Sequence, residues 1–447
     1  MRYGRAMNRI AHLIFALAVF LPASRVAAHA EEPSARSVHV LQDGLLVRAN
    51  FGVLSSAAPH RFVCEEAFLG GDNWLLGELG PTEWLTFGEK DIRRTEDGCS
   101  FEVVATVTGT PADAAVHPAS GSVAYLDNDP DGGGLFVSTD RGQSFERHEG
   151  LAAAGLQLTG VRFLDAMTLL VSAYSTDADR AAQLYRVAIG GSVEPLAVPP
   201  GLTFAVILDA GAGQIALLAR RESQGVMLWG APDSLDAAIE LETPVWPTGA
   251  RLSSDGDTLW IAGLHDGLGL TRGVRNGASA SWAELFTEDA AGCIGGDDSG
   301  LYTCGLARLD GADIFRIEGD SRTPHIDFRE MIGPAQCPET SDVGEICPVV
   351  WQEIASYFGV DPDADTGAGP DHHHGPDAGA HDHHGADSGD PGVDAELDAA
   401  DAGAPDDFFT GPVRGGGCAT TGDARRGQGF LIVLGLLGAG LRRRLAL

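Results

Sequence analysis

A short apolar segment recurs along this chain at a nearly constant spacing. Seven copies lie between residues 37 and 331, beginning at residues 45, 74, 123, 169, 215, 259 and 301. From the third copy onward the spacing is 42 to 46 residues, and each copy follows a turn rich in Gly, Asp, Ala or Ser. Short strands that repeat every 40 to 50 residues or so are typical of β-propeller blades. The repeat therefore predicts an all-β propeller.

The number of copies predicts seven blades, each of four antiparallel strands. Six blades are the alternative, because the first two copies are closely spaced and could belong to one blade. The pattern reveals no strand before residue 45 that could complete the first blade. We therefore expect a strand from around residues 323–331 to fill that place and close the ring with strands from both ends of the chain.

One turn carries a specific motif, LFVSTDRGQSF, at residues 135–145. Ser138 and Asp140 can accept hydrogen bonds from nearby backbone amides, and Gly142 can take a positive φ. Phe145 begins the next strand and can pack inward. These residue types predict a hairpin turn between the third and fourth strands of a blade. Turn chemistry accounts for each of them, so we expect their roles to be structural.

A shorter copy of the motif, TEDGCSF, occupies residues 95–101. Asp97 and Phe101 take the places of Asp140 and Phe145, and the two aspartates are 43 residues apart. Residues 55–62 form a degenerate third copy that lacks the aspartate and the glycine. We therefore expect the same turn in neighbouring blades.

The motif S/T-x-D-x-G-x-S/T-W/F resembles the Asp box of BNR-type β-propeller proteins, over about residues 40–330. Non-enzymatic propellers of this kind, of the photosystem II assembly factor and sortilin types, bind a protein or a peptide at the face or tunnel of the ring. The resemblance implies binding of a protein or a peptide. We expect a monomeric binding or scaffold module without a cofactor, whose partner is an envelope protein, a peptide or a glycan.

Asp boxes also occur in sialidases, so an exo-glycosidase is the alternative. Those enzymes resemble one another in a Phe-Arg-Ile-Pro segment before the boxes, three arginines and a tyrosine paired with a glutamate. The nearest match here, FRIE at residues 315–318, lacks the proline and follows the boxes. We assign no catalytic residue on this basis. An arginine cluster with a Tyr-Glu pair would favour the enzyme, whereas a bare apolar or acidic face would favour the binder.

Six of the seven cysteines lie in the part of the chain expected to fold, as in exported proteins with disulfides. They allow 15 pairings in principle. Proximity in the sequence suggests the pairs Cys64–Cys99, Cys293–Cys304 and Cys337–Cys347. The last two cysteines lie in residues 332–360, which we expect to be a small disulfide-stapled appendage with a helix at residues 349–358.

Both ends of the chain resemble processing signals. Residues 1–30 combine early arginines, an apolar stretch and an Ala-His-Ala site, which is typical of a signal peptide. Residues 415–447 combine a Gly-rich stretch, Cys418, a short apolar run and terminal arginines. This tail resembles the MYXO-CTERM sorting signal of myxobacterial surface proteins, which implies removal of the tail and modification of Cys418 for anchoring at the outer surface. A plain C-terminal membrane anchor is the alternative, although spanning needs about 20 apolar residues.

Residues 361–414 are rich in Asp, Gly, Ala and Pro, a composition that cannot bury enough apolar surface to fold. We expect a disordered acidic linker there. Its histidines form two clusters interleaved with aspartates and could bind a transition metal weakly, so metal capture is a further alternative. These histidines are His372, His373, His374, His381, His383 and His384.

The formal net charge is −33 at pH 7. Proteins that bind nucleic acids need clustered Lys and Arg to neutralise phosphates. Lys90 is the single lysine of the chain. The composition therefore argues against nucleic acid as a partner, and the membrane is expected to be reached only through the C-terminal region.

Overall fold

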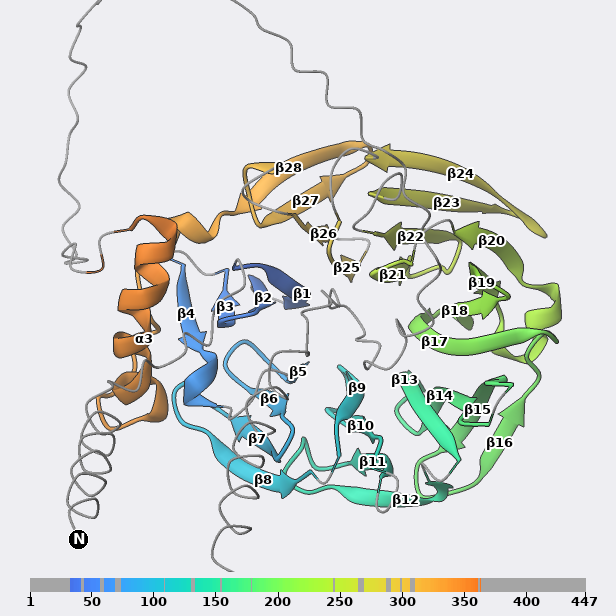
Figure 1. Ribbon diagram of the computed structural model, residues 1–447, viewed down its shortest axis with the longest axis horizontal. Helices are drawn as coiled ribbons and strands as arrows, with labels where there is room; N and C mark the ends of the chain where they lie inside the picture. The colour runs from blue at the N-terminus through green and yellow to red at the C-terminus, as the bar shows by residue number, and fades with distance from the viewer. Residues whose placement is uncertain are drawn as a thin grey trace, which may run out of the picture.

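Seven four-stranded antiparallel sheets stand around a ring in the computed structural model, so the chain is a seven-bladed β-propeller (Figure 1). The structure describes residues 33–360 and 362. Short stretches are excepted at 42–43, 57–59, 69–73, 108, 130–132, 153–154, 178, 244–245, 264–268, 287–290, 298–299 and 306–309. The signal-like residues 1–30, the linker histidines and Cys418 lie outside the described residues.

In each blade, consecutive strands pair in chain order, and the first strand is innermost (Figure 1). Blade 1 is β1 (Ala35–Leu41), β2 (Gly44–Ala49), β3 (Gly52–Ser55) and β4 (Arg61–Cys64). Blade 2 is β5 (Leu75–Glu78), β6 (Trp84–Phe87), β7 (Asp91–Thr95) and β8 (Glu102–Thr106). Blade 3 is β9 (Pro111–Val116), β10 (Val123–Asp127), β11 (Gly134–Ser138) and β12 (Glu146–Ala152). Blade 4 is β13 (Leu156–Asp165), β14 (Thr168–Ser175), β15 (Ala182–Ala188) and β16 (Val193–Leu196).

The remaining blades repeat this order. Blade 5 is β17 (Leu202–Gly211), β18 (Gln214–Arg221), β19 (Gln224–Gly230) and β20 (Ile239–Thr243). Blade 6 is β21 (Gly249–Leu252), β22 (Thr258–Ala262), β23 (Leu270–Asn276) and β24 (Ser279–Phe286). Blade 7 is β25 (Ile294–Asp297), β26 (Gly300–Cys304), β27 (Ile314–Glu318) and β28 (Ser321–Ile326). Three short 3-10 helices are η1 (Glu65–Ala67), η2 (Pro232–Ala237) and η3 (Phe328–Glu330).

The repeat seen in the sequence marks mainly the second strand of each blade. Six of the seven copies fall in β2, β10, β14, β18, β22 and β26. The copy at residues 74–76 instead falls in β5, a first strand, and its blade has its second strand at β6. This difference of one strand explains the short spacing between the first two copies, and the six-blade alternative is wrong.

The second strands are mostly apolar because both faces of a blade pack against neighbouring blades. In β18, Ile215 to Ala219 are all fully buried. Apolar clusters lie between successive blades, for example between blades 4 and 5 and between blades 5 and 6. Continuous apolar strands are expected wherever a sheet is covered on both faces.

The ring does not close in the way that we expected. β1 supplies the first strand of blade 1, and residues 321–326 form β28, the outer strand of blade 7. The expectation that residues 323–331 complete blade 1 is therefore wrong. The repeat did not reveal β1 because the apolar side chains of this strand alternate with polar ones. The copies of the repeat are continuously apolar.

The chain that follows blade 7 returns to the outer edge of blade 1. The N–H of Ile332 donates to the carbonyl of His60, and the N–H of Ala335 donates to the carbonyl of Phe62 at 2.8 Å. Phe62 and Pro334 form a parallel bridge. Backbone groups on the edge of β4 thereby gain partners, which an exposed edge strand lacks.

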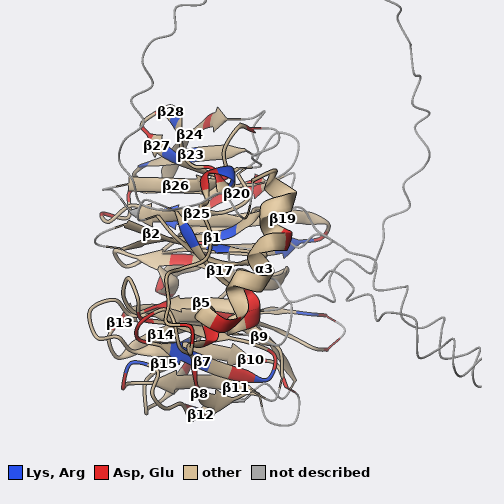
Figure 2. Cartoon of the chain, turned by 90° about the vertical axis from the view of Figure 1, so that its left-hand side faces the viewer, with Lys and Arg blue, Asp and Glu red and all other residues tan. Residues whose placement is uncertain are grey.

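A helix, α3 (Asp342–Phe358), packs against β4 and η1 on the outer side of the ring (Figures 1 and 2). The Ser341 side chain caps its start by accepting from the N–H of Gly344, and Gly359 ends it with a φ of 70°. Val343, Cys347, Trp351 and Ile354 share its buried face. The helix is longer than the expected residues 349–358, and Pro348 lies inside it.

Two of the three expected disulfide pairs are wrong. Cys293 pairs with Cys304 as expected. Cys64 pairs with Cys347, and Cys99 pairs with Cys337, across separations of 283 and 238 residues. The ring folds the C-terminal segment back onto blades 1 and 2, and proximity in space therefore overrides proximity in the sequence. Residues 332–360 are fastened to the propeller by these bonds and are not bonded to themselves.

Candidate functional site in the central channel

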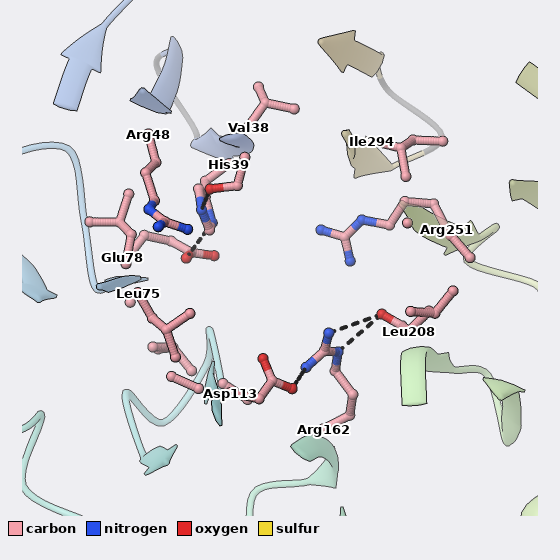
Figure 3. A pocket seen from close by; sticks show the side chains of 18 residues that line it. Val38, His39, Arg48, Leu75, Glu78, Asp113, Arg162, Leu208, Arg251 and Ile294 are labelled. Carbon is pink, nitrogen blue, oxygen red and sulfur yellow. Dashed lines mark hydrogen bonds and ion pairs between the residues drawn. The ribbon is translucent and has the colours of Figure 1, made fainter. Parts of the chain in front are cut away.

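The inner strands of all seven blades surround a cavity of about 190 Å³ at the centre of the ring (Figure 3). Every blade contributes at least one side chain to its wall. One contributor from each blade, in chain order, is His39, Glu78, Asp113, Arg162, Leu208, Arg251 and Ile294. The cavity is therefore a product of ring closure.

Glu78 pairs with His39 across the boundary between blades 1 and 2, with Nδ1 of His39 2.7 Å from Oε2 of Glu78. Burial alone would raise the pKa of Glu78. The charge of His39, the hydrogen bond from its ring and the charge of Arg251 outweigh burial and lower this pKa. Glu78 is thus a carboxylate in the channel wall, and its pKa is sensitive to Arg251 of blade 6.

Asp113 and Arg162 link blades 3 and 4. Oδ2 of Asp113 accepts from Nη1 of Arg162 at 2.5 Å and from the N–H of Val161 at 2.9 Å. The guanidinium also donates to the carbonyl of Leu208. Burial raises the pKa of Asp113, and the charge of Arg162 only partly opposes this effect. These bonds hold Arg162 in one position at the wall.

Asp209 and Arg251 repeat this arrangement between blades 5 and 6. Oδ2 of Asp209 accepts from the N–H of Leu252 at 2.8 Å, and Oδ1 is 3.1 Å from Nη1 of Arg251. Each aspartate therefore joins the inner strand of its blade to that of the next, a structural role. Arg251 is held by fewer bonds than Arg162, and its guanidinium points into the channel (Figure 3).

Arg48, from the second strand of blade 1, completes the charged wall. Its guanidinium carbon lies 4.6 Å from the centre of the Trp74 ring, a cation–π arrangement, and the residue is buried. Three arginines and one histidine thus stand against two carboxylates among the lining residues. The lining therefore has more basic than acidic side chains, with the Asp209 carboxylate bonded to Arg251 beside it, in a chain with a net charge of −33.

The turn at residues 138–145 lies between β11 and β12, the third and fourth strands of blade 3, as predicted. Oγ of Ser138 accepts from the N–H of Gly142 at 2.8 Å, and Asp140 accepts from the N–H and the hydroxyl of Ser144. Gly142 has a φ of 76°. Phe145 packs edge-on against Tyr125 in the core.

The shorter turn occupies the same place in blade 2, between β7 and β8. Oγ1 of Thr95 accepts from the N–H of Gly98, and Asp97 accepts from the N–H groups of Cys99 and Ser100. Phe101 packs against Phe68, with ring centres 5.3 Å apart. Neither turn contributes a residue to the channel wall.

Residues 315–318, the segment similar to a sialidase motif, lie in β27, the third strand of blade 7. Arg316 pairs there with Glu318 at 3.1 Å and does not line the channel. Nor do Tyr125, Tyr174, Tyr185 and Tyr302. The structure thus brings three arginines and a glutamate to one place, but none of these four tyrosines joins them.

The sequence reasoning missed the channel cluster altogether. Its charged residues are separated along the chain, as Arg162 is between Val161 and Phe163, and no two of them form a motif. A charge inside the first strand of a blade is the signal that could have found them, since first strands line the centre of a propeller.

Two features are absent from the part of the chain that the structure describes. Within it, no three His, Cys, Asp or Glu side chains come together in a way that could hold a metal ion. Its helices also include none with the length and apolar character needed to cross a membrane.

The fold and this cavity define the chain as a seven-bladed β-propeller with a charged central channel. No protein-family model matches the chain, and no curated protein is similar to it in sequence. Among solved structures it is similar to the β-propeller domain of the Trilobed protease from Pyrococcus furiosus, with a TM-score of 0.48 and 7% identity over 67% of this chain and 97% of that one.

Two other solved structures are similar at comparably low sequence identity. YCF48 from Cyanidioschyzon merolae has a TM-score of 0.43 and 10% identity, covering 65% of this chain and 94% of that chain. A chain of a nidogen/laminin complex has a TM-score of 0.36 and 11% identity, covering 55% and 94%. At these identities the similarity concerns the fold and assigns neither ligand nor activity.

Proposed function

We propose that this protein is an exported, surface-anchored propeller that binds an envelope protein, a peptide or a glycan without chemical conversion. The observation that carries this proposal is the central channel, where charged side chains from separate blades converge. Charged groups gathered in a concave site are typical of ligand binding. Loops at the two ends of the strands offer additional contact surface.

Export and anchoring rest on the two ends of the sequence. The basic and apolar residues 1–30 support secretion, and the tail with Cys418 supports processing and attachment at the outer surface. The disulfides add support, because such bonds persist in oxidising compartments.

A glycoside hydrolase is the second candidate, and a specific observation favours it. Arg48, Arg162, Arg251 and Glu78 meet in the channel, which is part of the sialidase-like set described above. The tyrosine nucleophile expected of such an enzyme is not among the lining residues. We therefore rank binding first.

Photo-crosslinking from the two faces of the ring tests the binding proposal. Because neighbouring strands are antiparallel, loops after first strands and loops after second strands lie on opposite faces. Met167 is on one such face and Lys90 on the other, and both are exposed. The full chain carrying a photoreactive residue at either position is irradiated on intact cells.

Reproducible capture of one partner from one position, and not from the other, is the expected result. Capture from neither position, together with release of sugar from envelope glycans by the purified protein, would replace binding by hydrolysis. Anchoring is tested separately by the intact mass of the protein extracted from the envelope, where retention of residues 419–447 would contradict processing at Cys418.

A further inference from the structure

We propose that the central channel binds a single carboxylate group, with Arg251 as its main anchor. This inference rests on the proposed binding function and names the ligand class for one site. The carboxylate belongs either to a small organic acid or to the free C-terminus of a peptide that enters the channel. Both sources present the same planar oxyanion to the wall.

Arg251 has hydrogen-bonding capacity left over. Its Nη1 donates to Oδ1 of Asp209 at 3.1 Å, and this is the one acceptor that its guanidinium has among the described residues. Both terminal nitrogens point into the channel (Figure 3), and about 35% of the side chain is exposed there. Two parallel N–H groups of a guanidinium match the two oxygens of a carboxylate.

The other two arginines give the wall its positive field without serving as the anchor. Arg162 uses its guanidinium on Asp113, on the carbonyl of Leu208 and on its neighbouring carbonyl of Val161. Arg48 is stacked on Trp74. Because these groups are already fixed in place, little conformational freedom is lost when an anion arrives.

The charge of the wall favours one negative charge over several. The carboxyls of Glu78 and Asp113 in the wall, and of Asp209 bonded to Arg251, stand against three arginines and His39. The excess of positive charge is therefore small. A phosphate dianion or a polycarboxylate would bring further negative charge close to these carboxyls, and like charges repel at short range. A monocarboxylate is the anion that the wall balances best.

The cavity of about 190 Å³ also restricts the ligand. Sites for drug-sized molecules usually enclose about 300 to 1,000 Å³. The channel therefore has room for a small acid or for the last residue of an extended chain. A folded loop of a partner must be bound elsewhere on the ring.

The test measures binding of defined ligands to the full-length protein by titration calorimetry. One arm uses lactate as a small monocarboxylate, with inorganic phosphate as the comparison. The other arm uses two copies of one short peptide, one with a free C-terminal carboxylate and one amidated. The expected result is that the carboxylate binds and that phosphate or the amidated peptide binds at least about tenfold more weakly.

Two variants in the same blade identify the anchor. Arg251→Gln removes the channel guanidinium, and we expect it to weaken carboxylate binding by at least about tenfold. Arg272→Gln is the matched control, because Arg272 pairs with Asp320 away from the channel. We expect this control to bind as the unchanged protein does. Circular dichroism and melting temperature confirm that each variant is folded.

The outcomes distinguish the two sources and also the two proposals. Binding of lactate alone identifies a free acid, and binding of the free peptide with rejection of the amidated one identifies a C-terminus. Equal binding of the free and amidated peptides would overturn the carboxylate site. So would the absence of binding by both lactate and the free peptide at millimolar concentration. Both results hold even if Arg251→Gln fails to fold. A partner still captured by crosslinking in that case would leave the binding function standing.

Discussion

The turns at Asp97 and Asp140 have the same local chemistry, yet the molecule uses them differently. In the blade 3 turn, hydroxyl and carboxylate groups accept from the backbone of residues within the turn, and Arg141 pairs with Glu83 of the adjacent blade 2. The blade 2 turn also holds the C-terminal segment. Its Cys99 is bonded to Cys337, its carbonyl accepts from the N–H of Val343, and Phe101 donates from its N–H to Asp342.

One turn motif can thus be both a structural unit and an attachment point. The N–H of Phe101 and the carbonyl of Cys99 are satisfied by the start of α3, a region more than 200 residues away in the sequence. Asp342 lies in the first turn of α3, where a negative side chain is favourable. The blade 2 turn is therefore tied to a segment distant in the sequence, whereas Arg141 ties the blade 3 turn to the adjacent blade.

The largest effect should come from breaking the attachment. Replacing Cys99 and Cys337 together by serine removes a cross-link between distant parts of the chain, and the free energy of unfolding should fall by about 2 to 5 kcal/mol. Guanidinium denaturation followed by tryptophan fluorescence measures this change. The control replaces Cys293 and Cys304 together by serine. This pair closes a loop with a separation of only 11 residues, so the free energy of unfolding should fall less. Equal losses for both pairs would contradict a special role for the blade 2 turn.

The second effect concerns the glycines at the two turns. Gly142 has a φ of 76°, and a Cβ there would lie 2.5 Å from Cδ1 of Leu85 in blade 2. Gly142→Ala should therefore lower the free energy of unfolding by about 1 to 3 kcal/mol. At Gly98, with a φ of 70°, the nearest atom would be 3.0 Å away on the Trp84 ring, so Gly98→Ala should cost somewhat less. Thermal melting of both variants checks the order, and a larger loss at Gly98 would show that the attached turn is the more strained one.

A third, smaller effect depends on pH. Burial alone would raise the pKa of Asp140, but hydrogen bonds from Ser144 and Ser138 outweigh it and hold this pKa below the ordinary 3.8. A lowered pKa in the folded state stabilises the protein above the unfolded value, and this contribution is lost as the pH falls. Asp140→Asn should therefore cost about 1 kcal/mol near neutral pH and progressively less below about pH 4.

Urea denaturation at pH 7 and at pH 3 measures this dependence, provided both proteins refold reversibly at each pH. Asp97→Asn should behave in the same way, because the N–H groups of Ser100 and Cys99 also hold the pKa of Asp97 down against burial. A difference between wild-type and variant that stays constant with pH would mean that the carboxylate charge is unimportant at these turns.

The smallest effect is expected at Arg141, which the blade 2 turn lacks. Its guanidinium pairs with Glu83 of blade 2, and about 43% of the side chain is exposed. Pairs of this kind contribute about 0.2 to 1 kcal/mol, so Arg141→Ala should lower stability only slightly. Arg141→Gly removes the same pair but relieves a φ of 60°, and it should be nearly neutral. A loss above about 2 kcal/mol for Arg141→Ala, measured by urea denaturation, would reveal a link between blades as important as the disulfide.

The repeat and the turn motif were sufficient to predict the propeller and the position of both turns. Strand periodicity and turn chemistry are local properties, and each blade expresses them within about 45 residues. The extra strand β1 escaped because its alternating pattern differs from that of the other copies. The predicted count of seven blades is confirmed, and the short spacing at residues 74–76 raised the six-blade alternative only because a first strand there resembles a second strand.

Composition and local pattern by themselves thus determined the all-β fold, the four-stranded blade and the turns that carry Asp97 and Asp140. The tertiary structure decided the disulfide partners of Cys64 and Cys99. It also decided the electrostatic interaction of Arg251 with Glu78 in the channel. The physical reason is that local hydrogen bonding and apolar periodicity act over a few residues, whereas these contacts form between blades brought together by closure of the ring.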